Sequence, residues 1–388
     1  MKLEYEILRV LKPEIEVEIK ERNGRIVKRE TIQGKCFVKN FAEYLRGILA
    51  RIGVTLTDTS GTQVSEAMGY EERHQPAYTT TYAKILNANA GDGKSEYGIV
   101  VGKGTTPPTV NDYKLEDQIP HGDGDNQLHY TASTVKDVEV NTGVSPPIIS
   151  VTIERSFVNN GSIDVDVNEI GLIILHGDYA ETRYYLIIRD VISTQTVSPG
   201  QSMVVRFKFK VQGKFVKNFI DFIHHGLKEV NESVIDTGGS SKRITMGETH
   251  YHVTGYFVTY YPGYSDADTD DDSYGIWAGN SDTPYAYDQY SLASRFDNST
   301  LKHYKGMVLE LVEETDKFKI PLRRAFENVT NSVQTIKEIG IVIWNKFWCE
   351  NCGTLNDTKF MIFRDVISPK DLNPGDVISI TVYITILK

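Results

Sequence analysis

An internal repeat constrains the fold of this chain more than any other feature of its sequence. The segment Phe-Val-Lys-Asn-Phe occurs at residues 37–41 and again, unchanged, at 215–219. Other matched segments follow in the same order: Tyr-Gly-Ile at 97–99 and 274–276, Glu-Ile-Gly at 169–171 and 338–340, Arg-Asp-Val-Ile-Ser at 189–193 and 364–368, and Pro-Gly at 199–200 and 374–375. Collinear matches of this kind predict a tandem duplication. The predicted units are residues 34–212 and 213–388, behind a leading segment of residues 1–33.

Each unit is predicted to open with an amphipathic helix and to continue as β-strands. Apolar residues recur about every 3.6 positions over residues 37–52 and again over 215–227. The closing segments, 205–211 and 378–386, alternate polar and apolar residues as half-buried strands do. The leading segment has the pattern of a strand or hairpin extension that turns at Asn23-Gly24. The predicted fold class is therefore mainly β: two tandem duplicated β-sandwich domains, jelly-roll or immunoglobulin-like, each with one amphipathic helix.

Length and charge narrow the class of protein. The 388 residues fit two domains, and each half is long enough to bury its own core. The formal net charge of −10 disfavours a nucleic-acid partner, because an acidic chain repels phosphate. The sequence has no stretch of about 18 apolar residues, so membrane insertion is not expected. The acidic start of the chain lacks the apolar core of a signal peptide, so synthesis in the cytoplasm is expected.

Four segments carry a resemblance to known proteins: residues 37–41, the glycine-flanked strand and Thr-rich turn at 98–108, Asn-Glu-Ile-Gly-Leu at 168–172, and residues 189–192 followed by Pro-Gly at 199–200. In these segments the chain resembles β-sandwich structural proteins of tailed phages and archaeal viruses, such as tail, spike, turret or decoration components. The resemblance implies location in the virion after synthesis in the host cytoplasm. It also implies assembly with copies of itself and other virion proteins, without catalytic residues or cofactors.

Three charged positions recur in both units and are the first candidates for a site. One interpretation is a carboxylate pair with an arginine that performs acid–base chemistry. The other, which the duplication favours, is a structural arginine–carboxylate latch that closes each sandwich. The residues of this predicted latch are Glu169, Arg189 and Asp190 in the first unit, and Glu338, Arg364 and Asp365 in the second.

Alternating aspartates form a candidate calcium site in the second unit. They are Asp266, Asp268, Asp270 and Asp272. Alternate carboxylate ligands suit a hard cation such as Ca²⁺, although the run lacks the glycine and the terminal glutamate of an EF-hand. The competing interpretation is a solvated acidic loop tip.

A second candidate metal site involves cysteines. Cys349 and Cys352 have half of a zinc-ribbon spacing, and His250 and His252 could complete the site from another strand. The alternatives are a local disulfide and two free thiols.

Tyrosines and glycosylation sequons support a different interpretation of the second unit. Six aromatic residues lie between 251 and 264, where exposed rings could stack on sugars or form a subunit contact, while alternation along strands would place about half of them in the core. Candidate glycosylation sites are Asn160, Asn231, Asn298, Asn328 and Asn356. If the host glycosylates surface proteins, the second unit would face outward.

The leading functional hypothesis is a non-enzymatic structural protein of a virion. In this hypothesis, residues 164–167 and 201–211 are strands whose edges could pair with neighbouring copies. The alternative is a carbohydrate-binding or adhesion module at a virion or cell surface, with a host-surface glycan as partner. An enzyme such as a glycoside hydrolase is a third possibility, for which no recognised motif is present.

Overall fold

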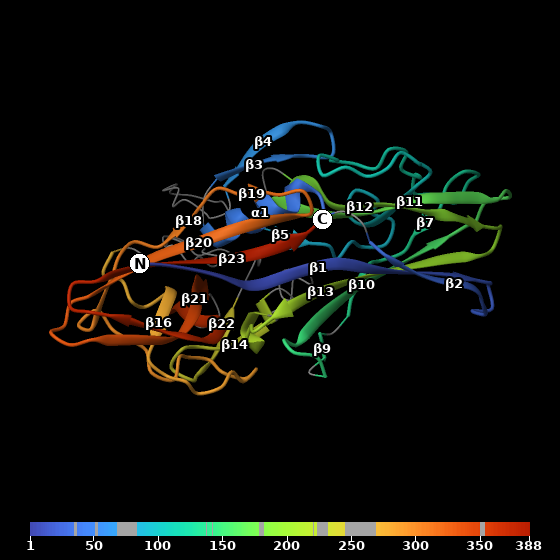
Figure 1. The fold of residues 1–388 in the computed structure, drawn as a ribbon. Coiled ribbons are helices and arrows are strands. Elements are labelled where there is room, and N and C mark those ends of the chain that lie inside the picture. The colour runs from blue at the N-terminus through green and yellow to red at the C-terminus, as the bar shows by residue number, and fades with distance from the viewer. Residues whose placement is uncertain are drawn as a thin grey trace.

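The chain is mainly β, as predicted, and Figure 1 shows its strands as long ribbons. The computed structural model describes residues 1–34, 37–50, 53–67, 84–136, 138–141, 143–177, 182–219, 221–222, 232–244, 269–349 and 354–388.

Among its described residues, the first half contains the helix α1 (Lys39–Ala50) and thirteen strands. These strands are β1 (Lys2–Lys20), β2 (Ile26–Gln33), β3 (Gly53–Thr57), β4 (Gln63–Ala67), β5 (Lys84–Asn87), β6 (Gly98–Gly102), β7 (His129–Tyr130), β8 (Thr134–Val135), β9 (Glu139–Asn141), β10 (Ile148–Val158), β11 (Val165–Gly177), β12 (Thr182–Val197) and β13 (Ser202–Gly213). Those of the second half are β14 (Glu232–Ile235), β15 (Ser241–Ile244), β16 (Gly275–Gly279), β17 (Leu301–His303), β18 (Met307–Val308), β19 (Val312–Glu313), β20 (Lys317–Asn328), β21 (Gln334–Cys349), β22 (Thr354–Leu372) and β23 (Val377–Leu387).

One 12-stranded sheet runs through both halves of the molecule, in the order β17-β20-β23-β1-β13-β10-β7 with shorter strands paired along its sides. Each half adds a smaller sheet of its own, β12-β11-β5 with β6 in the first half and β16-β21-β22 in the second. The two halves are therefore joined by a common sheet, which the prediction of two separate sandwich domains did not anticipate.

Strand β1 is the element that joins the halves, as Figure 1 shows. On one side it pairs antiparallel with β13 from Leu8 to Lys20. On its other side, β23 runs parallel to it over Lys2–Val10, and β2 pairs antiparallel over Glu14–Lys20. The hairpin predicted at Asn23-Gly24 is present, but its first strand begins at Lys2 and crosses an irregularity between Leu11 and Glu14.

The position of β13 corrects one expectation. Its residues 201–211 were predicted to offer a sheet edge to a neighbouring copy. Instead β13 is hydrogen-bonded on both sides, to β1 and to β10, so that its backbone groups are already used.

The repeated segment Phe-Val-Lys-Asn-Phe starts the helix in each half, and its asparagine fixes the helix to the strands. The Asn40 amide donates to the carbonyl oxygens of Thr57 (2.8 Å) and Leu186 (3.4 Å), and its oxygen accepts from the Thr57 N–H. Asn218 bonds in the same way to the backbone of Ile235 and to the carbonyl oxygen of Met361. Residues 217–219 and 221–222 are helical, at the place that α1 has in the first half.

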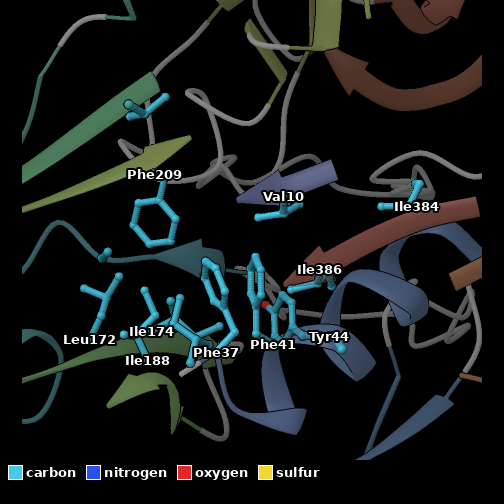
Figure 2. Packing of buried hydrophobic residues seen from close by; sticks show 14 of the residues in the cluster. Val10, Phe37, Phe41, Tyr44, Leu172, Ile174, Ile188, Phe209, Ile384 and Ile386 are labelled. Carbon is cyan, nitrogen blue, oxygen red and sulfur yellow. The ribbon is translucent and has the colours of Figure 1, made fainter. Parts of the chain in front are cut away.

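The largest hydrophobic core draws on both halves (Figure 2). Phe37 and Phe41 stack with ring centroids 4.8 Å apart, and Phe37 also contacts Phe209 of β13. Val10 of β1 and Ile386 of β23 belong to the same cluster, with Leu172, Ile174 and Ile188 of the first half's smaller sheet. Alternation along the strands turns these apolar side chains to one face of each sheet.

Candidate functional site

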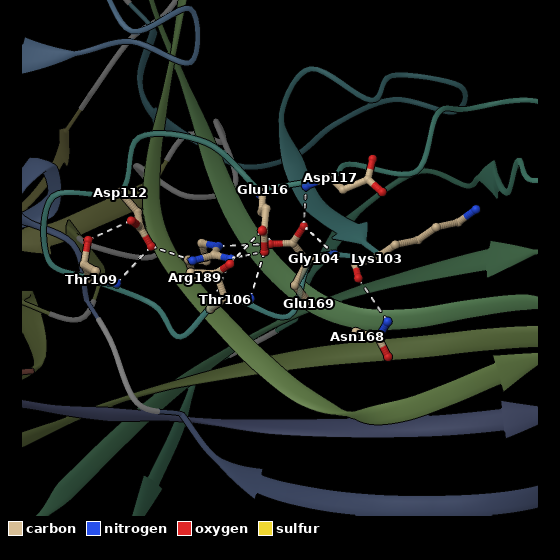
Figure 3. A network of polar contacts seen from close by, with 10 residues as sticks. All are labelled: Lys103, Gly104, Thr106, Thr109, Asp112, Glu116, Asp117, Asn168, Glu169 and Arg189. Carbon is tan, nitrogen blue, oxygen red and sulfur yellow. Dashed lines mark hydrogen bonds and ion pairs between the residues drawn. The ribbon is translucent and has the colours of Figure 1, made fainter.

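The glutamate and the arginine of the predicted latch form an ion pair inside the first half (Figure 3). Glu169 lies on β11 and Arg189 on β12, and the Arg189 Nε donates to Glu169 Oε2 over 3.0 Å. The two residues stand on neighbouring strands, with Gly171 directly opposite Arg189. Both side chains are buried, and Glu169 has no exposed surface.

The Glu169 carboxylate also holds the loop between β6 and β7. Its Oε1 accepts from the backbone N–H groups of Gly104 (3.1 Å) and Asp117 (2.7 Å), and its Oε2 accepts from Glu116 N–H (3.0 Å). Arg189 holds a second part of the same loop, since its Nη1 donates to Asp112 Oδ2 (2.8 Å) and its Nη2 donates to the Thr106 carbonyl (3.0 Å). The pair therefore pins a long loop to the smaller sheet.

The second half repeats this network with other loop residues. Arg364 Nε donates to Glu338 Oε2 over 2.9 Å, and both side chains are fully buried. Glu338 accepts from the N–H groups of Ala293 and Ser294, while Arg364 donates to the Thr283 carbonyl and to Gln289 Oε1.

The glutamate carboxylates explain why both halves have a glycine at the same position of the strand beside them. A Cβ atom on Gly102 would lie 2.4 Å from Glu169 Oε1, and one on Gly279 would lie 2.6 Å from Glu338 Oε1. No side chain fits where the carboxylate passes so close to the backbone. The glycine of each Glu-Ile-Gly segment is similarly constrained, because its Cβ would lie 2.8 Å from Leu115 in the first half and from Leu292 in the second.

The aspartates of the predicted latch do not join the glutamate–arginine pairs. Asp190 and Asp365 directly follow the arginines, so the alternation of a strand turns them to the opposite face. Asp365 accepts from the Lys214 ammonium (2.6 Å), from Val366 N–H (2.7 Å) and from the Tyr5 hydroxyl. Asp190 is fully buried. The three-residue latch is therefore corrected to a two-residue pair in each half, with the aspartates elsewhere.

The contact between Asp365 and Tyr5 joins the smaller sheet of the second half to β1. Burial raises the pKa of the Tyr5 hydroxyl. The hydrogen bond to Asp365 and the negative charge of Asp365 raise this pKa further, so the phenol stays protonated. The ring also lies 6.4 Å from that of Phe363.

Sequence reasoning missed a second pair of matched residues, the buried arginines Arg155 and Arg324. Arg155 donates to the carbonyl oxygens of Thr131 (2.7 Å), Ile99 (2.9 Å) and Tyr97 (3.0 Å), and also to that of Lys94. Arg324 on β20 donates to the carbonyl oxygens of Tyr304 (2.8 Å) and Tyr274 (2.8 Å), and also to that of Asp271. Their sequence signal is a short shared pattern, an arginine two residues before a phenylalanine: Arg155 before Phe157, and Arg324 before Phe326.

Both buried arginines stay charged although they are removed from water. Burial lowers the pKa of each guanidinium to about 10. Neighbouring groups partly offset this effect, among them Tyr130 beside Arg155 and Asp271 beside Arg324. Each remains protonated at neutral pH, and each gathers loop carbonyls around a planar fork of donors.

The candidate calcium loop is only partly placed. Asp266 and Asp268 lie outside the described residues. Asp270 has a positive φ of 63°, and its carbonyl accepts from the Asn298 amide. The Asp272 carboxylate lies 3.9 Å from Arg295 Nη1 and accepts from Asn298 N–H. Within the described ranges, no three His, Cys, Asp or Glu side chains meet as a metal ion would require.

The candidate zinc ligands, apart from Cys349, and the tyrosine cluster lie outside the described residues. Cys349 ends β21, while Cys352, His250 and His252 lie outside the described residues. The aromatic residues between 251 and 264 also lie outside them.

The glycosylation candidates fall in different surroundings. Asn160 is exposed and donates to Asp123, whereas Asn298 is half-buried. Asn328 is fully buried, and its amide donates to the carbonyls of Ser332 and Leu372. An attached glycan at Asn328 is incompatible with this fold, because the amide is used inside it. Asn356 lies in β22, and Asn231 falls outside the described residues.

Comparisons with protein-family models, with curated proteins and with solved structures found no match to this chain. In the part of the chain that the structure describes, no helix is long and apolar enough to cross a membrane.

Proposed function

We propose that this chain is a non-enzymatic structural subunit of a virion, built by tandem duplication of one β-sandwich unit. The duplication is supported by matched contacts at matched positions. The networks of Glu169 and Glu338, the helix clamps of Asn40 and Asn218, and the arginines Arg155 and Arg324 each bond to equivalent backbone groups in their own half.

One observation carries the non-enzymatic role: the matched glutamates and arginines are buried, and they bond to the protein's own backbone and side chains. A general acid or base must reach a proton of its substrate. Glu169 has no exposed surface and accepts four hydrogen bonds from loop and arginine donors. The carboxylate therefore serves the fold, which is the role expected of a building block.

The proposal is tested by imaging and sedimenting the purified chain over a range of concentrations. Rods, rings, spikes or larger particles in negative-stain images, together with association in sedimentation velocity, are expected. A chain that stays monomeric at millimolar concentration would contradict an assembly role. Binding to a glycan array without self-association would favour the adhesion alternative.

A further inference from the structure

The outer face of the large sheet, which is turned away from the core, differs between the two halves. In the second half this face is formed by β20, β23 and the amino-terminal part of β1, which lie side by side in Figure 1. Ile380 and Val382 of β23 belong to the hydrophobic core, so alternation turns Thr381 between them outward. Its partners on the neighbouring strands are Glu4 of β1 and Arg323 of β20, which share the outer face with it.

The matched row of the first half consists of Glu16, Arg206 and Glu154. There the middle residue is charged, and Arg206 forms ion pairs with the glutamates on both sides of it. In the second half the middle residue is a threonine, and the opposite charges beside it stand about 10 Å apart, which is two strand spacings. Among the described residues, neither Glu4 nor Arg323 forms an ion pair. Both charges of this row are therefore available to a second molecule.

The same face of the second half also exposes apolar side chains. Val377 of β23 is 42% exposed, and Met307 and Val312, which pair with outward residues of β20, are 37% and 41% exposed. The strand registers match these three residues to polar ones in the first half, in order Ser202, Thr134 and Glu139. Apolar side chains that are exposed on one of two duplicated faces, where the other face is polar, indicate a surface that another molecule covers.

We propose that two copies of this chain pack these outer faces against each other about a twofold axis that runs along β23. This axis stacks β23 on the β23 of the other copy and places β20 over the amino-terminal part of β1. Arg323 of each copy then meets Glu4 of the other, so that two ion pairs form across the contact. The short side chains of Ser379 and Thr381 in the middle allow the sheets to approach to about 10 Å, the usual separation of packed sheets.

Charge decides the direction of the twofold axis. An axis that crosses the strands at this row would stack β20 on β20 and β1 on β1, and would place Arg323 opposite Arg323 and Glu4 opposite Glu4. Like charges that face each other across an interface disfavour it, whereas the axis along β23 brings opposite charges together. Arg9 and Lys319, further along the same strands, come close in the favoured arrangement, but each already has a carboxylate partner within its own copy.

A twofold contact uses the same patch on both copies and closes on itself, so its product is a dimer. The dimer is the unit from which a larger particle would be built through other surfaces. This inference rests on the proposed assembly role and names one surface through which it occurs. The matched face of the first half is not expected to pair in this way, because Arg206 and its two glutamates already neutralise one another there.

Charge reversals test the contact by sedimentation equilibrium. Glu4→Arg alone and Arg323→Glu alone should each raise the dissociation constant of the dimer by about tenfold or more, because two attractive pairs become repulsive. An equimolar mixture of the two variants should form heterodimers as tight as the natural dimer, since both facing pairs are attractive again. The chain that carries both reversals should dimerise for the same reason. Arg22→Glu, an exposed charge in the turn at the other end of β1, is the control and should change nothing.

A steric substitution tests the middle of the face independently of charge pairing. Thr381→Arg should give a monomer, because a long charged side chain then separates the two sheets. The fold is expected to accommodate it, since Arg206 occupies the matched position of the first half. Thr152→Arg on the outer face of β10 is the matched control and should leave the dimer intact. Circular dichroism and a thermal melt would establish that every variant is folded.

The outcomes separate this contact from the assembly role. Association of the natural chain that neither Thr381→Arg nor the charge reversals weaken would overturn the contact, yet leave the assembly role intact. Single reversals that weaken the dimer without recovery in the mixture would overturn the pairing of Arg323 with Glu4, and with it the proposed axis. A natural chain that never associates would overturn both the contact and the assembly role.

Discussion

At the scale of single residues, the matched halves depend on polar side chains that act inside the fold. Arg155 and Arg324 each donate to several backbone carbonyl groups of the segments packed around them. Buried carbonyl groups without a donor are costly, at about 1–3 kcal/mol each. These two arginines therefore stabilise the loops more than any surface ion pair can.

Replacing Arg155 by methionine is expected to lower the free energy of unfolding by ~3 kcal/mol, since several buried carbonyls lose their donor while a buried charge is relieved. Urea titration followed by tryptophan fluorescence measures this change. Arg9→Met is the control, because its ion pair with Glu6 is exposed and contributes at most ~1 kcal/mol. Equal effects of the two substitutions would contradict the role assigned to Arg155.

Gly102→Ala is expected to destabilise the first half by ~2–3 kcal/mol, as overpacking of a tight interior does. Its Cβ would collide with the Glu169 carboxylate and lie 2.6 Å from the Asp117 carbonyl. In the control Gly91→Ala, the nearest atom to the new Cβ is Lys94 Cγ at 3.9 Å. Thermal unfolding of both variants checks the difference, and an unchanged melting temperature for Gly102→Ala would refute the packing argument.

At the scale of elements, the outer face of the large sheet in the first half is a ladder of opposite charges. Arg206 of β13 reaches Glu154 of β10 and also Glu16 and Glu18 of β1, and Arg29 of β2 reaches Glu18. Burial disfavours the charged form of Glu18, but hydrogen bonds from Arg29, Lys20 and Arg206 outweigh it and lower its pKa to about 2.

The low pKa of Glu18 makes the stability of this ladder depend on pH. The unfolded chain takes up the proton near the ordinary value of 4.5, so the contribution of Glu18 is complete above that pH. It is lost progressively as the pH falls toward 2. Urea midpoints measured from pH 7 to pH 2.5 should converge for the natural chain and Glu18→Gln; a constant difference between them would exclude this linkage.

Element by element, local patterns in the sequence predicted much of the fold. The 3.6-residue period located α1, the Asn23-Gly24 turn located the β1–β2 hairpin, and the glutamate–arginine pairs were anticipated from the repeat. The role of β1 was missed, because a parallel partner that arrives at residues 377–387 leaves no trace in local periodicity. Alternation on a strand also shows why Asp190 and Asp365 could not join their arginine neighbours.

At the scale of the whole molecule, the halves are expected to unfold together. They share a sheet through β1, and the largest core cluster includes residues from both. Helix α1 of the first half also contacts the second half, because Arg46 Nη1 lies 3.5 Å from Glu310 Oε2 and Lys39 Nζ lies 3.9 Å from Glu313 Oε2.

A single unfolding transition is therefore predicted for the natural chain, and Arg155→Met and Arg324→Met should both shift that same transition. Differential scanning calorimetry checks this through the ratio of calorimetric to van't Hoff enthalpy, which should be close to one. Two resolved transitions, each moved by only one of the substitutions, would show that the halves unfold independently.

The parallel pairing of β1 with β23 also has a consequence during synthesis. The ribosome makes β1 long before β23, so these two strands, which are far apart in the sequence, can pair only after residues 377–387 have emerged. Until then the amino-terminal part of β1 lacks its partner strand β23, so that it can mispair or bind a chaperone. Nascent chains stalled before residue 377 should therefore be sensitive to protease along β1, and chains in which β23 has also emerged should be protected there.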